Sequence, residues 1–533
     1  MGRSTSPSSA TSRRASWKRN SVMLNKRFIF LASVLAFFLL AGAIYNIGVL
    51  PEWSEGVLHP INVLPEEKTH SVGQNGITQA QVEDAIDGSV VKPAVPTVVK
   101  GTTPNPKETK AGEYDNIPDE ELAGHRFVDN YFEQVFSAEK PDPLNLDALE
   151  RLCARTEWTE GEIYLKCGAF SAGLTSIMSE LKVCLRMAAE AGVSLIFPVM
   201  PLRSSDNLKT FNFLNPEAYM GYEEWFDAEH LIERLPQACP KMKVVYPSQL
   251  DLIQSGDPGK IPVKYNWNID ISKAPGYHLF SSYFWVGRPF KTFFNRALAD
   301  LQVNAFINQD PNNDKTGVTV VELASYFLLF RVMDDPTRED LKVWNDLAHL
   351  NRFRPPIRSL VHQVLGKMKR PHYAVHFRAE NDTIWSSPEH QMEVDLQGLD
   401  DAWKKFGSKQ EGAEKPLVYL ACGDQAQIAM FEKAAEEKGW EVTHKYKLLK
   451  EDPGQYEALL SLPFDFQGGV DFGVMLKGEF FMGVGGSAFS STVANMRDPS
   501  GRYRGSSLTW PNDEGARNHL FNDGDAAQYP CCL

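Results

Sequence analysis

Residues 372–380 constrain the fold more than any other segment of this chain. They read HYAVHFRAE, a short apolar run typical of a fully buried strand in a parallel sheet, and the run ends abruptly at Arg378 and Glu380. In open α/β sheets, ligands bind outside the carboxyl ends of the strands. A planar guanidinium with a permanent charge is suited to binding a phosphate at such a place. The alternative is a surface arginine that merely ends a strand, and this segment alone leaves both interpretations open.

Helical and strand-like segments alternate along much of the chain. A loop of small residues at 168–173 precedes an apolar helical pattern over 174–191, and a strand-like run follows at 193–198. Loop, helix and strand within about 30 residues make one unit of a parallel sheet. A second block of this kind runs from about 355 to 500, with strands at 416–421 and 479–484 and a helix at 426–438 between them. We therefore predict an α/β protein with two α/β domains facing each other across a cleft. Between the two blocks, the clearest helical pattern covers 323–332.

The N-terminus indicates a membrane anchor. Residues 28–49 are almost unbroken apolar sequence, long enough at about 1.5 Å per residue to span a bilayer as a helix. Lys and Arg precede this run, and Glu52 and Glu55 follow it. The positive-inside rule then places the N-terminus in the cytosol and the rest of the chain on the other side. A cleaved signal peptide is the alternative, although the apolar run is longer than usual for one.

These patterns divide the chain into five parts. We predict a cytosolic tail (1–27), a transmembrane signal anchor (28–50), a disordered stem rich in Pro, Thr and Gly (51–115), an N-terminal α/β domain (116–350) and a C-terminal α/β donor-nucleotide domain with a polar tail (351–533). This is the common layout of a lumenal glycosyltransferase of the Golgi or endoplasmic reticulum.

Charge and cysteine content narrow the function classes. The net charge of −13 and the lack of a basic, aromatic-interleaved patch argue against nucleic acid as a partner. Seven cysteines fit an oxidising compartment, and their odd number leaves at least one thiol free or bonded to another chain. Cys153 and Cys167 could pair, and Cys239 could find a partner. Cys184 lies in an apolar helical pattern and is expected to be a small buried hydrophobe.

Two further strand ends carry polar residues. The run at 416–421 opens into a glycine turn and Asp424, which could hold a ribose hydroxyl or a base N–H, or could simply cap the next helix, the interpretation that we favour. The strand at 479–484 is followed by Gly485, Gly486 and Ser487 and then by a helix start. Backbone N–H groups at a helix N-terminus, beside hydroxyls and glycines, can cradle an anion. Together with Arg378, this turn predicts a diphosphate site. Asp471 lies upstream at an expected helix start, where capping and ligand binding are equally possible.

The sequence predicts no obligatory metal. There is no P-loop, no His-Glu-x-x-His, no zinc-type spacing and no Gly-x-Ser-x-Gly elbow. The one Asp-x-Asp, at Asp523 and Asp525, lies in the polar C-terminal tail and is interpreted as surface.

These segments resemble the GDP-fucose protein O-fucosyltransferases and their wider plant-like and fungal-type relatives, with this chain as a divergent member. The likeness spans roughly residues 165–500. Residues 376–380 match the family's His-x-Arg-x-Glu motif, and residues 470–498 match its later block without a gap. The positions that match in the later block are Asp471, Gly483, Ser487, Phe489, Ser490, Val493, Arg497 and Asp498. Residues 168–173 and 225–232 carry weaker likenesses.

The resemblance implies a GT-B-type pair of Rossmann-like domains and inverting transfer of fucose from GDP-fucose to a protein or glycan acceptor. By position, Arg378 would hold the β-phosphate and the glycosidic oxygen, His376 would lie near the nucleotide, and Ser487, Phe489 and Ser490 would surround its phosphates. The sequence departs from the family pattern where the first loop reads Gly173-Leu174-Thr175-Ser176 in place of an asparagine, and at Ala488 in place of a serine. Alternatives are transfer of another nucleotide sugar, or a non-catalytic sugar- or glycoprotein-binding receptor on the same scaffold.

The predicted site thus has one catalytic residue, Arg378, a set of donor-binding residues, a first glycine loop and no metal ligand. The donor-binding set is His376, Glu380, Asp424, Asp471, Gly485, Gly486, Ser487, Phe489, Ser490, Ser491 and Arg497, and the glycine loop contributes Gly168 and Gly173.

Overall fold

The computed structural model describes residues 131–140, 142, 144–159, 161–168, 170, 173–203, 219–274, 288–324, 339–380, 387–407, 412–484, 487–497 and 518–520. The predicted tail, signal anchor and stem lie outside these residues, as do Gly485, Gly486 and the Asp523–Asp525 pair. Among the helices of the described ranges, none combines the length and apolar character needed to cross a bilayer.

Six parallel strands form the first sheet, in the order β5-β2-β1-β8-β7-β6. These strands are β1 (Ile163–Gly168), β2 (Ser194–Ile196), β5 (Val244–Val245), β6 (Leu250–Asp251), β7 (Ile261–Ile269) and β8 (Val318–Ala324). β3 (Val199–Pro201) and β4 (Tyr219–Gly221) form a separate antiparallel pair. The strand predicted at 193–198 is confirmed as β2. The helix expected over 323–332 is wrong at its start, because Leu323 and Ala324 end β8, a run rich in β-branched residues that pairs with β1.

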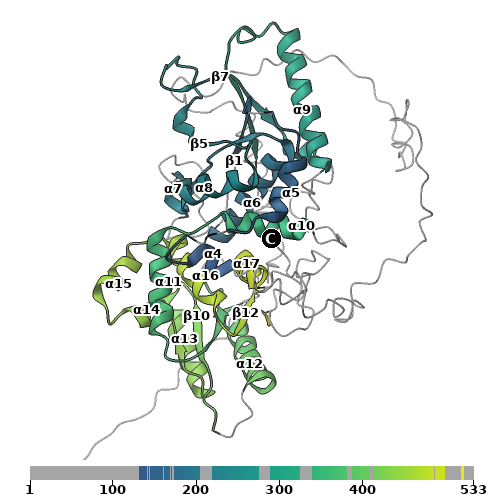
Figure 1. The fold of residues 1–533 in the computed structure, drawn as a ribbon. Coiled ribbons are helices and arrows are strands. Elements are labelled where there is room, and N and C mark those ends of the chain that lie inside the picture. Colours follow the sequence, from purple (N-terminus) through teal and green to yellow (C-terminus); the bar gives the residue numbers. More distant parts are fainter. Residues whose placement is uncertain are drawn as a thin grey trace, which may run out of the picture. The chain divides into compact units, whose positions relative to one another are not determined.

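Helices of the first half accompany this sheet (Figure 1). They are α4 (Tyr131–Phe136), α5 (Asp147–Arg155), α6 (Leu174–Ala191), α7 (Tyr222–Trp225), α8 (Ala228–Ala238), α9 (Arg288–Ile307) and α10 (Glu339–His349), with short 3₁₀ turns at Pro247–Gln249 and Ile271–Lys273. Although α4 precedes β1, it packs against α16 of the second half, where the Phe136 ring lies 6.2 Å from that of Phe472. One helix of the predicted N-terminal domain therefore packs with the C-terminal half.

Helix α6 confirms the helical pattern at 174–191 and lies at the centre of the described structure. Every one of its residues is buried. It contacts α9 and α10 on one side and α16 and α17 on the other, and Figure 1 shows it between the first sheet and these two helices. It ends at Gly192, whose φ of 71° is left-handed, and an added Cβ there would lie 1.9 Å from the Glu157 carbonyl oxygen. Only glycine fits that position without moving the backbone.

The second sheet has five strands in the order β11-β10-β9-β12-β13, all parallel except the last pairing. The strands are β9 (His372–His376), β10 (Leu417–Ala421), β11 (Val442–Thr443), β12 (Phe480–Val484) and β13 (Asn518–Leu520). The helices of this half are α11 (Pro355–Lys367), α12 (Pro388–Phe406), α13 (Gln425–Glu437), α14 (Lys445–Leu449), α15 (Pro453–Leu460), α16 (Phe464–Leu476) and α17 (Ala488–Arg497). The strands predicted around Val375, at 416–421 and at 479–484, and the helix at 426–438, are confirmed.

Both faces of the second sheet are covered, which explains why its strands are continuous apolar runs. All residues of β9, β10 and β12 are buried. Tyr373 and Val375 pack in a cluster with apolar residues of α12 and α13, whereas Ala374 belongs to the larger cluster that includes α16. Alternate residues of a strand point to opposite faces, so a strand that is covered on both sides needs apolar residues throughout.

The disulfides correct the expected cysteine pairing. Cys153 pairs with Cys239, and Cys167 pairs with Cys184. Cys153 on α5 meets the end of α8, and Cys167 on β1 meets α6, so tertiary packing selects the partners and separation along the chain does not. Cys184, expected to be reduced, is bonded. Among the described cysteines, Cys422 is free and buried.

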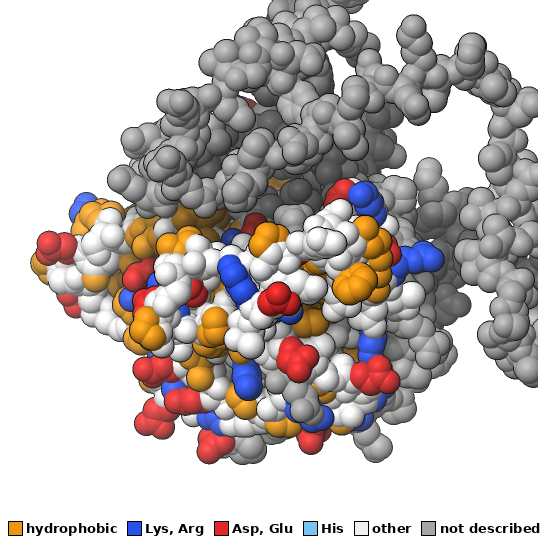
Figure 2. Space-filling view, turned by 90° about the horizontal axis from the view of Figure 1, so that it is seen from above, with side chains coloured by type: hydrophobic (Ala, Val, Ile, Leu, Met, Phe, Trp, Pro, Cys, Tyr) orange, Lys and Arg blue, Asp and Glu red, His pale blue; other side chains and the backbone are white. Residues whose placement is uncertain are grey.

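Charges of both signs mix on the surface. On the face shown in Figure 2, Lys and Arg side chains are interspersed with Asp and Glu side chains, and neither sign gathers into a broad patch. The described residues on this face thus form no extended basic patch.

Candidate functional site

The structure brings the three predicted strand ends to one edge of the second sheet. β9 lies between β10 and β12 and runs parallel to both. His376, the last residue of β9, is in register with Ala421, the last residue of β10. The segments that follow these strands therefore begin side by side, as expected for a parallel sheet that binds ligands at its carboxyl edge.

Arg378 is held by contacts to its backbone and to its side chain. Its N–H donates to Oε1 of Gln391 at 3.0 Å, and Nε2 of Gln391 donates to the Arg378 carbonyl at 2.7 Å. Gln391 is fully buried on α12. The Arg378 guanidinium donates through Nη1 to Oε2 of Glu380 at 2.6 Å. These contacts place a partly buried positive charge at the end of β9 with little freedom to turn away.

Glu380 links this arginine to the neighbouring strand end. Its second oxygen, Oε1, accepts the N–H of Gly423, which follows β10, at 3.0 Å. Burial alone would raise the pKa of Glu380, but the positive charge of Arg378 and the hydrogen bond from it lower the pKa below its ordinary value. Glu380 is therefore an ionised group that orients Arg378, and its two oxygens are already used by protein donors.

His376 lies under the start of α17. Its Nδ1 is 2.7 Å from Oγ of Ser490, and its ring centroid is 4.6 Å from that of Phe489. Ser490 Oγ also accepts the N–H of Val484 at 3.0 Å. Burial lowers the pKa of His376 to about 4, with Arg378 adding to the effect and Glu380 opposing it. The ring is thus neutral near pH 7, and it contacts Phe489 and Ser490 of α17.

Gly483 lets α17 approach β12 closely. A Cβ at this position would lie 2.4 Å from Oγ of Ser490. The helix begins directly after Ser487, whose carbonyl accepts the N–H of Ser491 at 3.0 Å. Ser487, Ser490 and Ser491 are buried. The first N–H groups of a helix have no partner within the helix, so this end of α17 carries positive dipole charge at the sheet edge.

Asp471 is placed differently from the prediction. The helix around it begins at Phe464, so Asp471 lies inside α16 and is no cap. Its carboxylate forms a buried ion pair with Lys445 and accepts the hydroxyl of Tyr419 at 2.7 Å. Burial raises the pKa of Asp471, while Lys445 and Tyr419 act in the opposite direction. Both oxygens have protein partners, so the described contacts assign Asp471 a structural role.

Asp424 and Arg497 also serve the fold. Asp424 caps α13, accepting the N–H groups of Ala426 at 2.9 Å and Gln427 at 3.1 Å, as the favoured interpretation expected. Arg497 donates to the last carbonyls of α16, Met475 at 2.9 Å and Leu476 at 3.0 Å. These contacts do not support donor binding by either residue.

The two glycines of the first loop contact charged side chains. A Cβ on Gly168 would lie 3.3 Å from Oε1 of Glu322, which pairs through Oε2 with Lys166 at 2.7 Å. A Cβ on Gly173 would lie 2.6 Å from Nη2 of Arg203. Gly173 is therefore needed for the close approach of an arginine that the sequence analysis did not select.

Sequence reasoning missed Arg203, Asp465, Phe464 and Gln391. Arg203 Nη2 donates to Oδ1 of Asp465 at 2.6 Å, and Phe464 lies between this pair and Gly423. An acidic residue in the first helical turn after Pro463 is a helix-start signal, so the sequence could have placed Asp465 at a helix N-terminus. No local signal identifies its partner 262 residues away.

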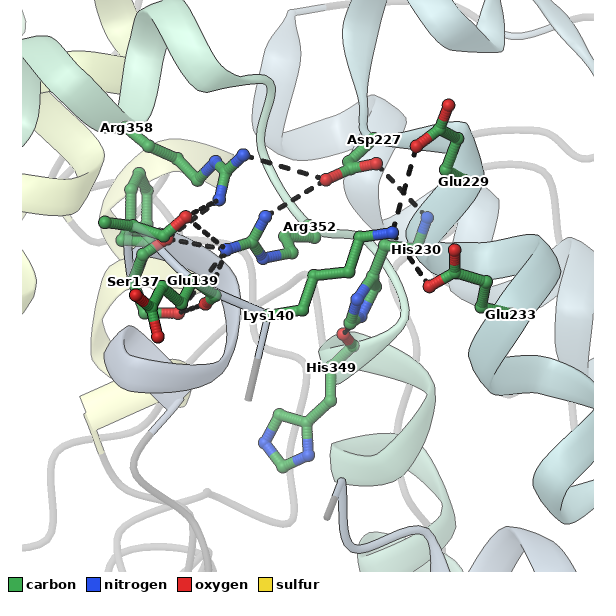
Figure 3. Close-up of polar contacts among 12 residues, drawn as sticks. Ser137, Glu139, Lys140, Asp227, Glu229, His230, Glu233, His349, Arg352 and Arg358 are labelled. Atoms are coloured by element: carbon green, nitrogen blue, oxygen red, sulfur yellow. Dashed lines mark hydrogen bonds and ion pairs between the residues drawn. The ribbon is translucent and has the colours of Figure 1, made fainter. Parts of the chain in front are cut away.

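The weakly matching stretch 225–232 forms a structural junction (Figure 3). Asp227 caps α8 through the His230 N–H and accepts Nη1 of Arg352 at 3.0 Å. Nη2 of Arg352 donates to the carbonyls of Ser137 at 2.6 Å and Glu139 at 2.8 Å, just past the end of α4. The junction ties together α4, α8 and the segment between α10 and α11, and none of these contacts involves a strand-end residue.

No group of three or more His, Cys, Asp or Glu side chains that could hold a metal ion occurs in the part of the chain that the structure describes.

Comparison with known proteins gave matches among solved structures only. No family model matches the chain, and no curated protein does. POFUT1 in complex with GDP matches with a TM-score of 0.36 and 12% identity, covering 64% of this chain and 96% of that one. NodZ alpha-1,6-fucosyltransferase soaked with GDP-fucose matches with a TM-score of 0.30 and 12% identity, covering 63% and 92%. An Arabidopsis thaliana FUT1 mutant in complex with GDP has a TM-score of 0.33 and 11% identity, covering 70% and 77%. Scores at this level do not establish a shared fold, so the proposal below rests on the geometry of the site.

Proposed function

We propose that this chain is a fucosyltransferase-like glycosyltransferase that uses GDP-fucose as donor and a protein or glycan as acceptor. The observation that carries the proposal is the environment of Arg378. A guanidinium held by Glu380, on a backbone held by Gln391, stands at the carboxyl edge of a parallel sheet, beside a neutral buried His376 and the N-terminus of α17. Two independent sources of positive potential at one sheet edge suit a nucleoside diphosphate.

The proposed chemistry is displacement at the anomeric carbon with inversion. The C–O bond to the diphosphate breaks with its electron pair leaving on the phosphate oxygen, while the acceptor hydroxyl forms the new C–O bond and releases its proton. Negative charge grows on the diphosphate as the bond breaks. Fixed donors aimed at developing charge are the largest single contribution in such sites. Arg378 would supply the positive charge that stabilises the departing diphosphate. The N–H groups at the start of α17 would contribute to this stabilisation.

The roles within the site follow from the contacts. Glu380 would keep Arg378 in position, because one of its oxygens holds the guanidinium and the other is tied to Gly423. His376 and Phe489 would line the nucleotide side, with Ser490 fixing the histidine ring. Gly485 and Gly486, together with Ser487, would approach the phosphates. No divalent ion is assigned a task, since arginine and helix dipole supply the positive charge.

The proposal includes the cellular setting. We place the enzyme in the Golgi or endoplasmic reticulum membrane, anchored by residues 28–50, with residues 51–115 as a stem and the catalytic part in the lumen in a GT-B-type arrangement. Two disulfides in the described part of the chain support an oxidising compartment. Transfer of another nucleotide sugar, or a receptor that binds sugar nucleotide or glycoprotein without turnover, are the alternatives.

Thermal unfolding of the full-length chain in the presence of nucleotide sugars tests the donor. We expect GDP and GDP-fucose to raise the midpoint, because a ligand that binds only the folded state stabilises it. UDP-sugars should have no effect at the same concentrations. Stabilisation by UDP-sugars alone would contradict the choice of donor. Stabilisation by GDP-fucose without turnover on any acceptor would favour the receptor alternative.

A further inference from the structure

Arg203 and Asp465 form a buried ion pair between the two halves of the chain. Arg203 follows β3 in the first half, and Asp465 lies in the first turn of α16 in the second. Nε and Nη2 of Arg203 donate to the same oxygen, Oδ1 of Asp465, at 3.0 and 2.6 Å. The side chains are 13% and 1% exposed, respectively. Removing one partner of a buried pair leaves the other charge uncompensated, so this contact holds its two elements together tightly.

The Asp465 carboxylate also holds the start of α6. It accepts the N–H of Leu174, the first residue of α6, at 3.3 Å, and the Arg203 main-chain N–H at 3.3 Å. A negative charge is stabilised near a helix N-terminus, and Asp465 lies at two of them, α6 and its own α16. One carboxylate thus joins the start of α6 to the helix that begins at Phe464.

A continuous series of contacts leads from this pair to Arg378. The Arg203 guanidinium carbon lies 5.4 Å from the ring centroid of Phe464. The same ring touches Gly423, where an added Cβ would lie 2.6 Å from Cε2 of Phe464 and 3.3 Å from Oε1 of Glu380. Gly423 donates its N–H to Glu380, which holds the Arg378 guanidinium. A shift at the start of α16 would therefore reach Arg378 through Gly423 and Glu380.

We propose that Arg203 is a positioning residue for the GDP-sugar site, acting through Asp465, Phe464, Gly423 and Glu380 on Arg378. This inference rests on the proposed function and deepens it, because it makes the geometry of the donor site depend on a contact between the two halves. Loss of the Arg203 charge frees Asp465 and with it the Phe464 ring. Glu380 then no longer fixes the guanidinium, so both GDP affinity and the rate of transfer fall.

A double-mutant cycle on GDP affinity tests this coupling in the full-length chain. GDP dissociation constants are measured by titration calorimetry for wild type, Arg203→Ala, Arg378→Ala and the double variant, each with its folded fraction determined by circular dichroism. If Arg203 is purely structural, Arg203→Ala lowers the folded fraction, and its effect on the free energy of GDP binding adds to that of Arg378→Ala. A positioning role instead makes the two losses non-additive, since Arg203 acts only through Arg378.

Arg186→Ala is the matched control. Nε and Nη2 of Arg186 donate to one oxygen of Glu190 at 2.9 and 2.6 Å, the same fork on a single carboxylate oxygen. This pair is also buried and belongs to α6, but it lies about 18 Å along the helix from Leu174 at 1.5 Å per residue. It therefore reports the cost of losing a buried pair without the connection to Gly423.

We expect Arg203→Ala to weaken GDP binding about tenfold and to lower kcat by about 10–100-fold, because small misplacements of a catalytic group are costly. In the Arg378→Ala background the same change should have no further effect on affinity, and Arg186→Ala should leave affinity unchanged. Should Arg203→Ala fail to fold, Arg203→Gln serves in the same cycle, because it removes the charge while keeping most of the side chain and a hydrogen-bond donor.

Three results separate failure of the inference from failure of the proposed function. Additive losses, or unchanged affinity in a folded Arg203 variant, overturn the positioning role and leave the GDP-sugar site standing. An equal loss of GDP affinity in Arg186→Ala also overturns the positioning role, since losing any buried ion pair would then have the same effect. A folded wild-type chain that binds no GDP overturns the proposed function, and the inference with it.

Discussion

Replacing Asp471 with asparagine should cost about 3–5 kcal/mol of unfolding free energy at pH 7, the range for breaking a buried ion pair from one side. The side chains of Lys445 and Asp471 are 3% and 7% exposed. Asparagine keeps the size of the side chain and can still accept the Tyr419 hydroxyl, which is 2.7 Å away in the wild type. The loss is therefore that of the negative charge, and the Lys445 ammonium is left buried without compensation.

The cost should shrink as pH rises. Burial alone would lower the pKa of Lys445, but in the wild type Asp471 raises it above its ordinary value. In Asp471→Asn only burial remains, so the folded pKa falls below the unfolded value of about 10.4. Between these two pKa values the unfolded variant binds more protons than the folded one, so its stability rises with pH. The wild type gains no stability from Lys445 in this window. Its stabilisation by Lys445 is fully present below the unfolded pKa and is lost as pH rises through the folded pKa.

Urea unfolding followed by circular dichroism at pH 7 and pH 9 measures both effects. Glu133→Gln is the control, because it breaks an ion pair with Lys477 whose side chains are 50% and 41% exposed, and such pairs contribute about 0–1 kcal/mol. A loss below about 1 kcal/mol for Asp471→Asn, or an equal loss at both pH values, would refute a buried charged pair.

Three further predictions concern the metal, acid stability and a helix cap. Transfer should survive excess EDTA, because no step is assigned to an ion; complete loss that Mn²⁺ restores, together with lower activity when Asp523 and Asp525 are replaced, would contradict the mechanism. Stability should fall as pH drops from about 6.5 towards 4. Burial lowers the pKa of His230 and His349 to about 4, so the unfolded chain takes up protons at a higher pH than the folded chain does. Equal urea midpoints at pH 7 and pH 5 would contradict this. Asp424→Ala should cost about 0.5–2 kcal/mol by removing the cap of α13 while GDP affinity stays the same, and a selective loss of GDP affinity would show that Asp424 binds the donor.

The strands of the second sheet could be predicted from the sequence because each is a complete local signal. β9 is buried throughout, has an apolar centre between two histidines and needs no knowledge of its neighbours. The parallel order of β10, β9 and β12 then places Arg378, Gly423 and Ser487 at one edge, so the core of the candidate site followed from the strand ends alone. α6 was equally clear, because its apolar residues recur at helical spacing and Gly192 ends it.

The helix around Asp471 was misjudged because its glycines resemble a turn. α16 contains Gly468, Gly469 and Gly473. A Cβ on Gly473 would lie 2.7 Å from both Phe136 and Val361, so this glycine allows α4 and α11 to approach the helix. Close packing between helices, which no local pattern records, thus explains residues that otherwise signal a helix break.

Contacts between residues distant in sequence could not be predicted, for the same reason. The sequence left capping and ligand binding open for Asp471, and it could not identify Lys445 as its partner. Nor could it join Arg203 to Asp465, or Cys167 to Cys184, because each pairing depends on how helices lie on the sheets. For Arg497, predicted by position to bind the donor, the structure shows hydrogen bonds from its guanidinium to the end of α16, a contact that the sequence did not indicate.

Turnover of GDP-fucose by Arg378→Ala tests the central claim most directly. The purified full-length chain is supplied with GDP-fucose and a panel of glycoprotein and glycan acceptors, and GDP release is followed over time. Arg370→Ala is the matched control, because Arg370 lies just before β9 at the opposite end of the same strand, where it pairs with Glu441 at 2.6 Å. Removing a donor aimed at developing charge lowers the rate by about 10²–10³-fold, so Arg378→Ala should lose turnover to this extent and Arg370→Ala should keep it. Near-normal turnover by a folded Arg378→Ala variant would contradict the account.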